Sequence, residues 1–343
     1  MRSTGARASR ACAAARPCSA RRWPAARSTG ARAARCKSSR RVRDPVLDRG
    51  VPTVLSVPRA DELAELLRVL RTWQREGGPV QLHPGDVGWF WRFGADATAA
   101  AVRTWSRDGV VLAVGLRDGD RLLRLAVAPG AEDDDELARQ VADDVAHAER
   151  GVLPAGAVDV EARSGGALVE RLREAGWTDG EAWTPLVRGL TEPVEPAGVD
   201  VETVGADGAP LWAAVQGAAF GRPTPAVERW HAMAAGPAFA DARCLLARDA
   251  DGTAVAVAVV WSAGAGRPGV LEPMGVHPDH RGHGYGTAIT VAAAAHLRAL
   301  GASSAAVCTP SANGAGVATY RAAGFRELPA VRDVHRAVPG LAG

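Results

Sequence analysis

Glycines alternate with other residues in a short loop, Arg-Gly-His-Gly-Tyr-Gly, at positions 281–286. The loop follows an apolar run that ends in Val276-His277-Pro278 and precedes a stretch with the apolar spacing of a helix. Glycines let the backbone approach a ligand closely, and the unpaired N–H groups at a helix start attract phosphate. The loop therefore predicts a pyrophosphate site, to which Arg281 would add positive charge.

Two familiar phosphate-binding loops do not fit this segment. A Walker loop requires Gly-Lys-Ser/Thr, which is missing here. A dinucleotide fingerprint requires Gly-x-Gly-x-x-Gly and an acidic residue about 20 positions later, but these glycines alternate strictly and nothing acidic occurs near position 305. The loop is therefore of another kind.

The segment resembles the GNAT superfamily of N-acetyltransferases, whose coenzyme A signature is R/Q-x-x-G-x-G/A after a strand that ends in V-x-P. Arg281, Gly284 and Gly286 match this signature. Downstream, Asn313, Tyr320 and Gly324-Phe325 resemble the family's N-x-x-A-x-x-x-Y-x-x-x-G-F element. Gly316 stands where the family usually has Ala, which is a mild change at a small-residue site.

The resemblance implies acetyl-CoA as co-substrate and no metal. The backbone around Met274 to Val276 would hold the thioester carbonyl and the pantetheine arm, where a β-bulge splays the strand from its neighbour. Asn313 would cap its helix or bind the pantetheine arm, and capping alone is the simpler expectation. The expected coenzyme-binding residues are Met274, Gly275, Val276, Arg281, Gly282, His283, Gly284, Tyr285, Gly286, Thr287 and Asn313.

Acetyl transfer to an amine requires an oxyanion donor and an acid for the departing thiolate. Tyr320 is the candidate acid, because a phenol with a pKa near 10 suits a thiolate of similar basicity. Core packing with a bonded hydroxyl is the alternative for Tyr320. Glu272 matches the position of the family's base, which generally acts through a water, and a solvated surface carboxylate is the alternative.

Two other sets of reactive side chains carry simpler interpretations. Cys308 lies in a predicted strand without a positioned His, which favours a packed thiol over a nucleophile. His277, His280 and His283 recur at three-residue spacing across a loop, which favours solvent-exposed residues beside the phosphates over a metal site.

Apolar patterning predicts the elements around the loop. Strands are expected at 244–247, 254–261, 270–276 and 305–308, and helices at 287–300 and 314–323. The N-terminal half repeats this order, with strands at 110–116, 122–127 and 158–161, and helices at 61–74 (with Asp61 as cap), 136–150 and 167–175. The interval from Val-Ala-Pro at 127–129 to Gly176 nearly equals the interval from Val-His-Pro at 276–278 to Gly324. This similar spacing indicates two copies of one domain.

The N-terminal copy lacks the reactive residues. Five consecutive acidic residues, 132–136, stand where a pyrophosphate would bind, and like charge would oppose binding. Leu172 occupies the position that aligns with Tyr320. We expect a degenerate domain that supports the fold and lends residues to the acceptor cleft.

Residues 1–45 are rich in Ala and Arg, with thirteen basic residues and one acidic residue, whereas residues 46–343 carry 28 basic and 37 acidic residues. The basic segment is predicted to be a disordered tail, with nucleic-acid binding or organelle targeting as alternatives. Two cysteines beyond the tail cannot form a disulfide framework, and no apolar run is long enough to span a membrane. These features favour a cytoplasmic protein that binds neither nucleic acid nor membranes through its core.

The predicted fold is α/β of the α+β type, with a mixed, mostly antiparallel sheet flanked by helices in each of two tandem acetyltransferase-like domains. The expected boundaries are 46–190 for the degenerate domain, 191–198 for a linker and 199–343 for the catalytic domain. The expected reaction is direct acetyl transfer to a primary amine, by a monomer or homodimer, and a non-catalytic acyl-CoA sensor is the alternative. The acceptor is a small amine or a peptide N-terminus. The acidic core hints at a cationic amine, and residues 220–230 are a candidate wall of its pocket.

Overall fold

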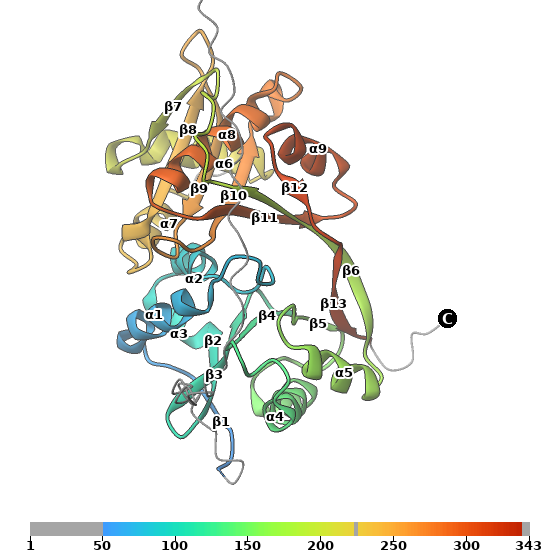
Figure 1. Cartoon of the computed structure of the whole chain (residues 1–343). Coiled ribbons are helices and arrows are strands. Elements are labelled where there is room, and N and C mark those ends of the chain that lie inside the picture. Colours follow the sequence, from blue (N-terminus) through green and yellow to red (C-terminus); the bar gives the residue numbers. More distant parts are fainter. Residues whose placement is uncertain (1–50, 223–225, 338–343) are drawn as a thin grey trace, which may run out of the picture. The chain divides into compact units, whose positions relative to one another are not determined.

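The computed structural model describes residues 51–222 and 226–337. The basic segment 1–45, which was predicted to be a disordered tail, lies outside the described residues. From residue 47 onward the chain forms one compact unit (Figure 1).

Strands and helices alternate along both halves of this unit. The strands are β1 (Val54–Ser56), β2 (Val102–Arg107), β3 (Val110–Arg117), β4 (Leu122–Val127), β5 (Val158–Glu161), β6 (Thr178–Gly189), β7 (Asp200–Thr203), β8 (Ala242–Arg248), β9 (Ala254–Trp261), β10 (Gly269–Val276), β11 (Ser304–Pro310), β12 (Arg326–Glu327) and β13 (Val331–Arg336). The α-helices are α1 (Leu63–Trp73), α2 (Pro84–Phe90), α3 (Ala95–Ala101), α4 (Asp135–Ala146), α5 (Gly166–Glu174), α6 (Ala209–Ala219), α7 (Val227–Ala234), α8 (Tyr285–Ala299) and α9 (Gly314–Ala322). Short 3₁₀ turns include η2 (Trp91–Phe93).

A single thirteen-stranded sheet runs through both halves in the order β1-β2-β3-β4-β5-β13-β6-β11-β10-β9-β8-β7, with β12 beside β6. Its pairs are antiparallel except for β4 with β5 and β10 with β11. The predicted fold class, a mixed and mostly antiparallel sheet flanked by helices, is confirmed. We expected a sheet in each half, and the structure joins them into one.

Strand exchange joins the two halves. The second part of β6, from the N-terminal half, pairs with β11, from Ser304 opposite Gly189 to Pro310 opposite Trp183. Strand β13, from the end of the chain, returns to pair with β5 and β6. Each exchanged strand covers an edge whose N–H and C=O groups would otherwise lack partners. The boundaries 46–190, 191–198 and 199–343 stay a prediction, although no helix or strand occurs between Gly189 and Asp200.

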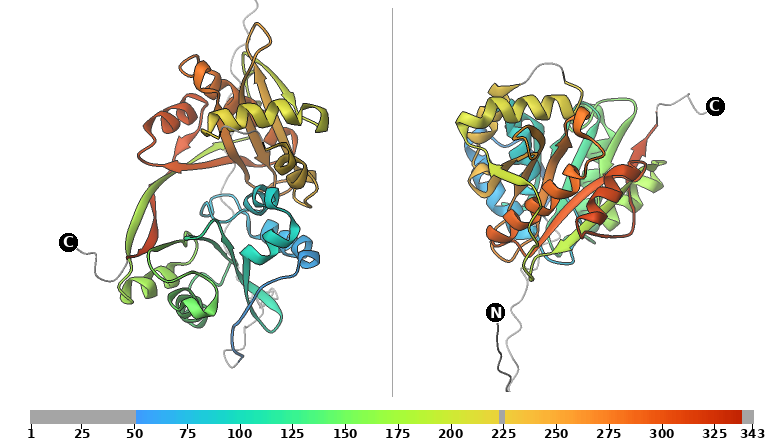
Figure 2. Two further views of the ribbon diagram at one scale, coloured as in Figure 1. Left: turned by 180° about the vertical axis from the view of Figure 1, so that it is seen from behind. Right: turned by 90° about the horizontal axis from the view of Figure 1, so that it is seen from above.

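Helices α6 and α8 cover opposite faces of the sheet in the C-terminal half (Figures 1 and 2). Alternate residues of β9 explain this arrangement, because successive side chains of a strand point to opposite faces. Val257 and Val259 pack in the apolar cluster that contains α6, whereas Ala256 and Ala258 pack in the cluster that contains α8. The cluster of α6 also contains α1 and α2, so one core is shared by both halves.

Most of the predicted elements are present, with small shifts at their ends. The strands predicted at 122–127, 158–161 and 254–261 match β4, β5 and β9 in both bounds. The helix predicted at 136–150 ends at Ala146 and is followed by a 3₁₀ turn. Asp61 lies in a 3₁₀ turn, and the residue that precedes α1 is Glu62, so the predicted cap was wrong.

Helix α2 was not predicted, and tertiary packing explains why. It contains Gly85 and Gly88, which weaken a helix. A Cβ atom added at either glycine would lie 2.5 Å from the side chain of Trp261. The glycines therefore let α2 lie directly on Trp261 of β9, and this contact is invisible in the local pattern.

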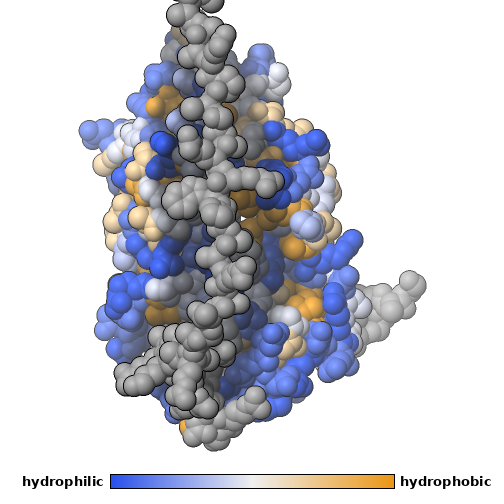
Figure 3. Space-filling model, viewed as in Figure 1, coloured by the Kyte–Doolittle hydropathy of each residue, from blue (hydrophilic) through white to orange (hydrophobic). Residues whose placement is uncertain are grey.

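The visible surface is mostly hydrophilic, with scattered apolar patches (Figure 3). Among the described residues, no helix combines the length and the apolar character that crossing a membrane requires.

Candidate active site

The glycine loop leads from β10 into the first turn of α8. Gly282 and Gly284 adopt left-handed backbone conformations, with φ of 82° and 84°, which glycine tolerates without strain. Gly284 precedes α8, and no side chain caps this helix start. Within the described part of the chain, the N–H groups of residues 282–287 donate to no other residue. They are free to bind an anion.

A cavity of about 390 Å³ opens at this helix start. Its lining combines the loop with the end of β10, the end of α6 and the first turns of α9: Ala219, Phe220, Met274, Gly275, Val276, His280, Arg281, Gly282, Gly284, Tyr285, Gly286, Thr287, Ala315, Gly316 and Thr319. Of the expected coenzyme-binding residues, all but His283 and Asn313 line it.

Two glycines keep this cavity narrow but open. A Cβ atom added at Gly275 would lie 2.7 Å from Cβ of Ala219, and one added at Gly286 would lie 3.2 Å from Cγ2 of Thr319. Glycine therefore lets β10 approach α6 and lets α8 approach α9.

Arg281 has a structural role at the mouth of the cavity. Its Nη2 donates to the carbonyl oxygen of Ala219 at 2.9 Å, and its Nε to that of Val276 at 3.4 Å. The guanidinium thus connects the end of α6 with the end of β10. Its positive charge remains beside the free N–H groups of the loop.

Strand β10 separates from β11 beside the cavity. The two strands pair in parallel only at Gly269 and Val270. The pairing of β10 with β9 shifts register between Leu271 and Met274, which is the irregularity expected there. Beyond Val270 the edge of β10 that faces β11 forms no ladder, so its backbone groups are available to a ligand.

Asn313 caps helix α9. Its Oδ1 accepts from the N–H of Gly316 at 3.1 Å, and its Nδ2 donates to Oγ1 of Thr309 at 3.0 Å. A Cβ atom at residue 316 would lie 2.5 Å from Nδ2 of Asn313, so Gly316 fits this cap closely. The structure therefore shows the capping role that the sequence favoured.

Tyr320 is buried in α9, with its ring centroid 6.2 Å from that of Phe325. Burial raises the pKa of its phenol, and the negative charge of Glu272 raises it further. The phenol is consequently protonated at neutral pH and can donate a proton.

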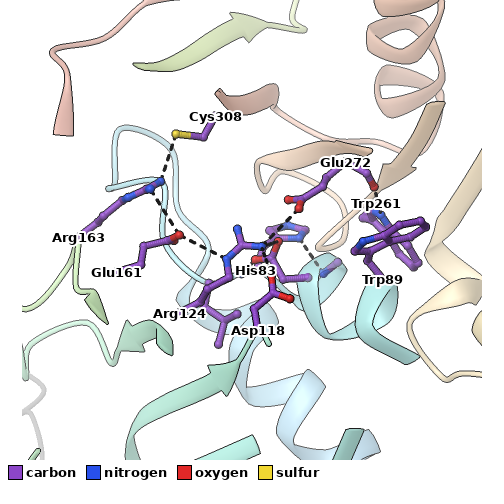
Figure 4. A network of polar contacts seen from close by, with 12 residues as sticks. His83, Trp89, Asp118, Arg124, Glu161, Arg163, Trp261, Glu272 and Cys308 are labelled. Carbon is purple, nitrogen blue, oxygen red and sulfur yellow. Dashed lines mark hydrogen bonds and ion pairs between the residues drawn. The ribbon is translucent and has the colours of Figure 1, made fainter. Parts of the chain in front are cut away.

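Glu272 lies on β10 in an ion-pair network that reaches the N-terminal half (Figure 4). Nη1 of Arg124, on β4, lies 3.4 Å from Oε1 of Glu272 and 3.1 Å from Oδ1 of Asp86. Its Nε lies 3.3 Å from Glu161, which pairs with Arg163. Sequence reasoning missed Asp86 and Arg124, because no local pattern brings residues so far apart together.

Burial and the positive charge of Arg124 act in opposite directions on these carboxyl groups. For Glu272, burial would raise the pKa, but Arg124 and a hydrogen bond with Asp86 hold it below its ordinary value. For Asp86, burial dominates and raises the pKa well above its ordinary value, despite Arg124. A neutral Asp86 beside an ionised Glu272 is therefore the expected state at this site.

Cys308, on β11, ends the same network. Nη1 of Arg163 donates to its sulfur at 3.2 Å. Burial raises the pKa of the thiol to about 11, although the charge of Arg163 opposes this. The thiol form dominates at neutral pH, so the side chain is a poor nucleophile.

The histidines of the loop lie at its surface. The rings of His277 and His280 are 5.6 Å apart, and His283 stacks on Tyr285 at 6.1 Å. In the part of the chain that the structure describes, no group of three or more His, Cys, Asp or Glu side chains is arranged to hold a metal ion.

A second cavity, of about 400 Å³, lies beside the same helix α6. Its walls come from both halves of the chain, and they are formed by Trp89, Arg92, Trp212, Ala213, Gln216, Arg222, Ala226, Glu228, Arg229, Trp230 and Met233. Part of the segment 220–230, proposed from the sequence as a wall of the acceptor pocket, is among them. The residues of α2 and η2 were not foreseen, because α2 itself was not.

Comparisons with known proteins agree with this geometry. Residues 212–325 match the model of the acetyltransferase (GNAT) family. No curated protein matches the chain.

Three solved structures resemble most of the chain. A GCN5-related N-acetyltransferase from Sphaerobacter thermophilus is 20% identical, with 84% of this chain and 97% of that chain covered and a TM-score of 0.50. A tandem GNAT protein from the clavulanic acid biosynthesis pathway is 19% identical, with 82% and 97% covered and a TM-score of 0.50. A GNAT-family acetyltransferase from Colwellia psychrerythraea is 16% identical, with 83% and 98% covered and a TM-score of 0.51. At these identities the likeness concerns the fold.

The family pattern and the fold thus coincide on the elements that form the glycine-loop cavity, from α6 to Phe325. Residues 212–325, in the C-terminal half of the chain, are thus a domain that matches the GNAT acetyltransferase family.

Proposed function

We propose that the protein transfers an acetyl group from acetyl-CoA to a primary amine, by direct attack of the amine on the thioester. The observation that carries this proposal is the cavity at the start of α8, where the N–H groups of residues 282–287 donate to no other described residue. These groups suit a pyrophosphate, and the open edge of β10 suits the amide groups of a pantetheine arm. Acetyl-CoA would supply the activated acetyl group.

Tyr320 would donate the proton to the departing sulfur. Burial and the charge of Glu272 raise the pKa of its phenol, so the phenol stays protonated at neutral pH but is a weaker acid than a free tyrosine. A protonated donor beside a forming thiolate avoids the release of a poorly solvated anion. The C–N bond forms first and gives a tetrahedral intermediate, the C–S bond then breaks, and the sulfur leaves as a thiol.

Glu272 would receive the proton that the amine loses, directly or through a water. Its lowered pKa keeps the carboxylate ionised at neutral pH, but it also weakens the group as a base.

Tyr320→Phe tests the proposal, because it removes only the phenolic oxygen. We expect kcat for thiol release with the best amine of a panel to fall about 100-fold, with unchanged binding of coenzyme A in calorimetry. Thr203→Val, which removes a hydroxyl from an exposed position on β7, is the control.

Unaltered turnover in Tyr320→Phe would contradict the role of the tyrosine. Tight binding of coenzyme A without turnover of any amine would instead favour a non-catalytic acyl-CoA sensor. Absence of coenzyme A binding by the folded protein would refute both functions.

A further inference from the structure

The second cavity and the coenzyme cavity lie along the same helix, α6. Trp212, Ala213 and Gln216 of α6 line the second cavity, and Ala219 and Phe220, at the end of the same helix and just after it, line the first. The opposite wall of the second cavity includes Trp89 of α2, which Figure 4 shows next to Trp261 and Glu272. Glu272 does not line this cavity, but its charge acts on Arg92, which does.

Three guanidinium groups face this cavity, from Arg92, Arg222 and Arg229, against a single carboxylate, Glu228. Within the described residues, none of the three arginines forms an ion pair. The Nε atom of Arg92 is buried without a hydrogen-bond partner. The charge that lines the cavity is thus mainly positive.

Aromatic rings hold two of these guanidinium groups in place. Cζ of Arg92 lies 4.3 Å from the ring centroid of Trp89 and 4.4 Å from that of Phe93. Cζ of Arg229 lies 5.4 Å from the same Phe93 ring. Nη1 of Arg92 donates to the carbonyl oxygen of Trp89 at 2.7 Å. Stacking on rings leaves the remaining N–H groups of a guanidinium available to an oxyanion.

Electrostatic effects on Arg92 agree with this picture. Burial lowers its pKa to about 10, and the like charges of Arg222 and Arg229 contribute to the lowering, against Asp118 and Glu272. A bound anion would relieve this repulsion.

We infer that the acceptor is an amine that also carries a carboxylate or phosphate group, with the anionic group against Arg92, Arg222 and Arg229 and the amine toward Glu272. Trp89 and Met233 would contact its apolar part. The inference rests on the proposed function and names its substrate class. This substrate class replaces the cationic amine that the acidic composition of the core suggested. The side chains that line this cavity are mainly positive, and the acidic residues in excess lie elsewhere.

Matched pairs of amines test the inference. Phenylalanine against phenethylamine isolates a carboxylate, and phosphoethanolamine against ethanolamine isolates a phosphate. We expect the anionic member of at least one pair to bind the coenzyme-A-loaded protein about tenfold or more tightly in calorimetry, and to give the higher kcat/KM for thiol release. The pair with the larger ratio distinguishes carboxylate from phosphate.

Arg222→Gln combined with Arg229→Gln removes two exposed charges of the cavity. We expect this variant to lose most of the preference for the anionic member while it binds coenzyme A normally, and Arg92→Gln to do the same. Arg68→Gln, at an exposed position on α1, is the matched control and should keep the preference.

Three results would overturn the inference: equal or tighter binding of the neutral members, no binding of either anionic amine, or a preference unchanged in the arginine variants. Calorimetry with coenzyme A alone separates these results from failure of the proposed function, because the arginines lie outside the coenzyme cavity.

Discussion

Each half of the chain contains a strand, a loop and a helix in the same order, but the N–H groups at the helix start differ between the halves. In the C-terminal half, the N–H groups at the start of α8 are free and the adjoining cavity measures about 390 Å³. In the N-terminal half, Glu132 accepts from the N–H of Gly130 at 2.5 Å, and Asp134 accepts from that of Leu137 at 2.8 Å. The cavity between the starts of α4 and α5 measures only about 10 Å³.

The acidic loop of the N-terminal half therefore occupies, with its own carboxylates, the backbone groups that a phosphate would use. Both oxygens of Asp134 also pair with Arg107, at 2.7 and 3.0 Å, so the arginine that could attract a phosphate is engaged as well. Leu172 is fully buried where the other half has Tyr320. We infer that the N-terminal copy is degenerate, and that its remaining contribution is to supply side chains to the other half.

Arg124→Gln should have the largest effect, because it removes the cation that contacts Asp86, Glu161 and Glu272. Breaking a buried ion-pair network leaves uncompensated charge, and we expect the free energy of unfolding to fall by about 3–5 kcal/mol in urea titrations at neutral pH. Arg124→Lys keeps the charge and is the control. Equal stability of Arg124→Gln and the parent would show that the N-terminal half does not support Glu272.

Gly284→Asp would give α8 the carboxylate cap that α4 already has. One negative charge about 5 Å from a pyrophosphate costs about 3 kcal/mol at the effective dielectric constant of a protein surface, so coenzyme A should bind about 100-fold more weakly in calorimetry. Gly284→Asn has the same shape and also tolerates the left-handed backbone, so it isolates the charge. Similar losses in both variants would attribute the effect to the backbone instead.

His83→Asn addresses helix α2, which brings Asp86 and Trp89 to the site. Nδ1 of His83 accepts from the N–H of Gly85 at 2.9 Å, and burial lowers the pKa of the imidazole to about 4. Because the folded pKa lies below the unfolded value near 6.5, the unfolded chain takes up the proton first, and stability is lost as pH falls from about 6.5 toward 4.

From pH 7 to pH 5 this group should cost the parent about 2 kcal/mol. Asn also caps helices but does not titrate, so His83→Asn should lose less stability over the same interval. Urea titrations at both pH values measure the difference. Parallel losses in parent and variant would show that His83 is protonated in the folded protein.

The sequence by itself determined the C-terminal half in outline. Local periodicity predicts the strands β9 and β10. The glycine loop and the spacing from Asn313 to Tyr320 are recognisable because their residues lie close together in the chain. The acidic loop and Leu172 likewise marked the N-terminal copy as different. Local patterns suffice here because helix starts, caps and strand alternation are set by near neighbours.

Only the tertiary structure decided how the halves act on each other. The exchange of β6 and β13, the contact of Arg124 with Glu272, and the arginine-lined cavity join residues that are far apart in the chain. Helix α2 depends on glycines that fit against Trp261, a contact that overrides their poor helix propensity. Such pairings depend on complementary packing and charge in the folded chain. No local sequence pattern predicts them.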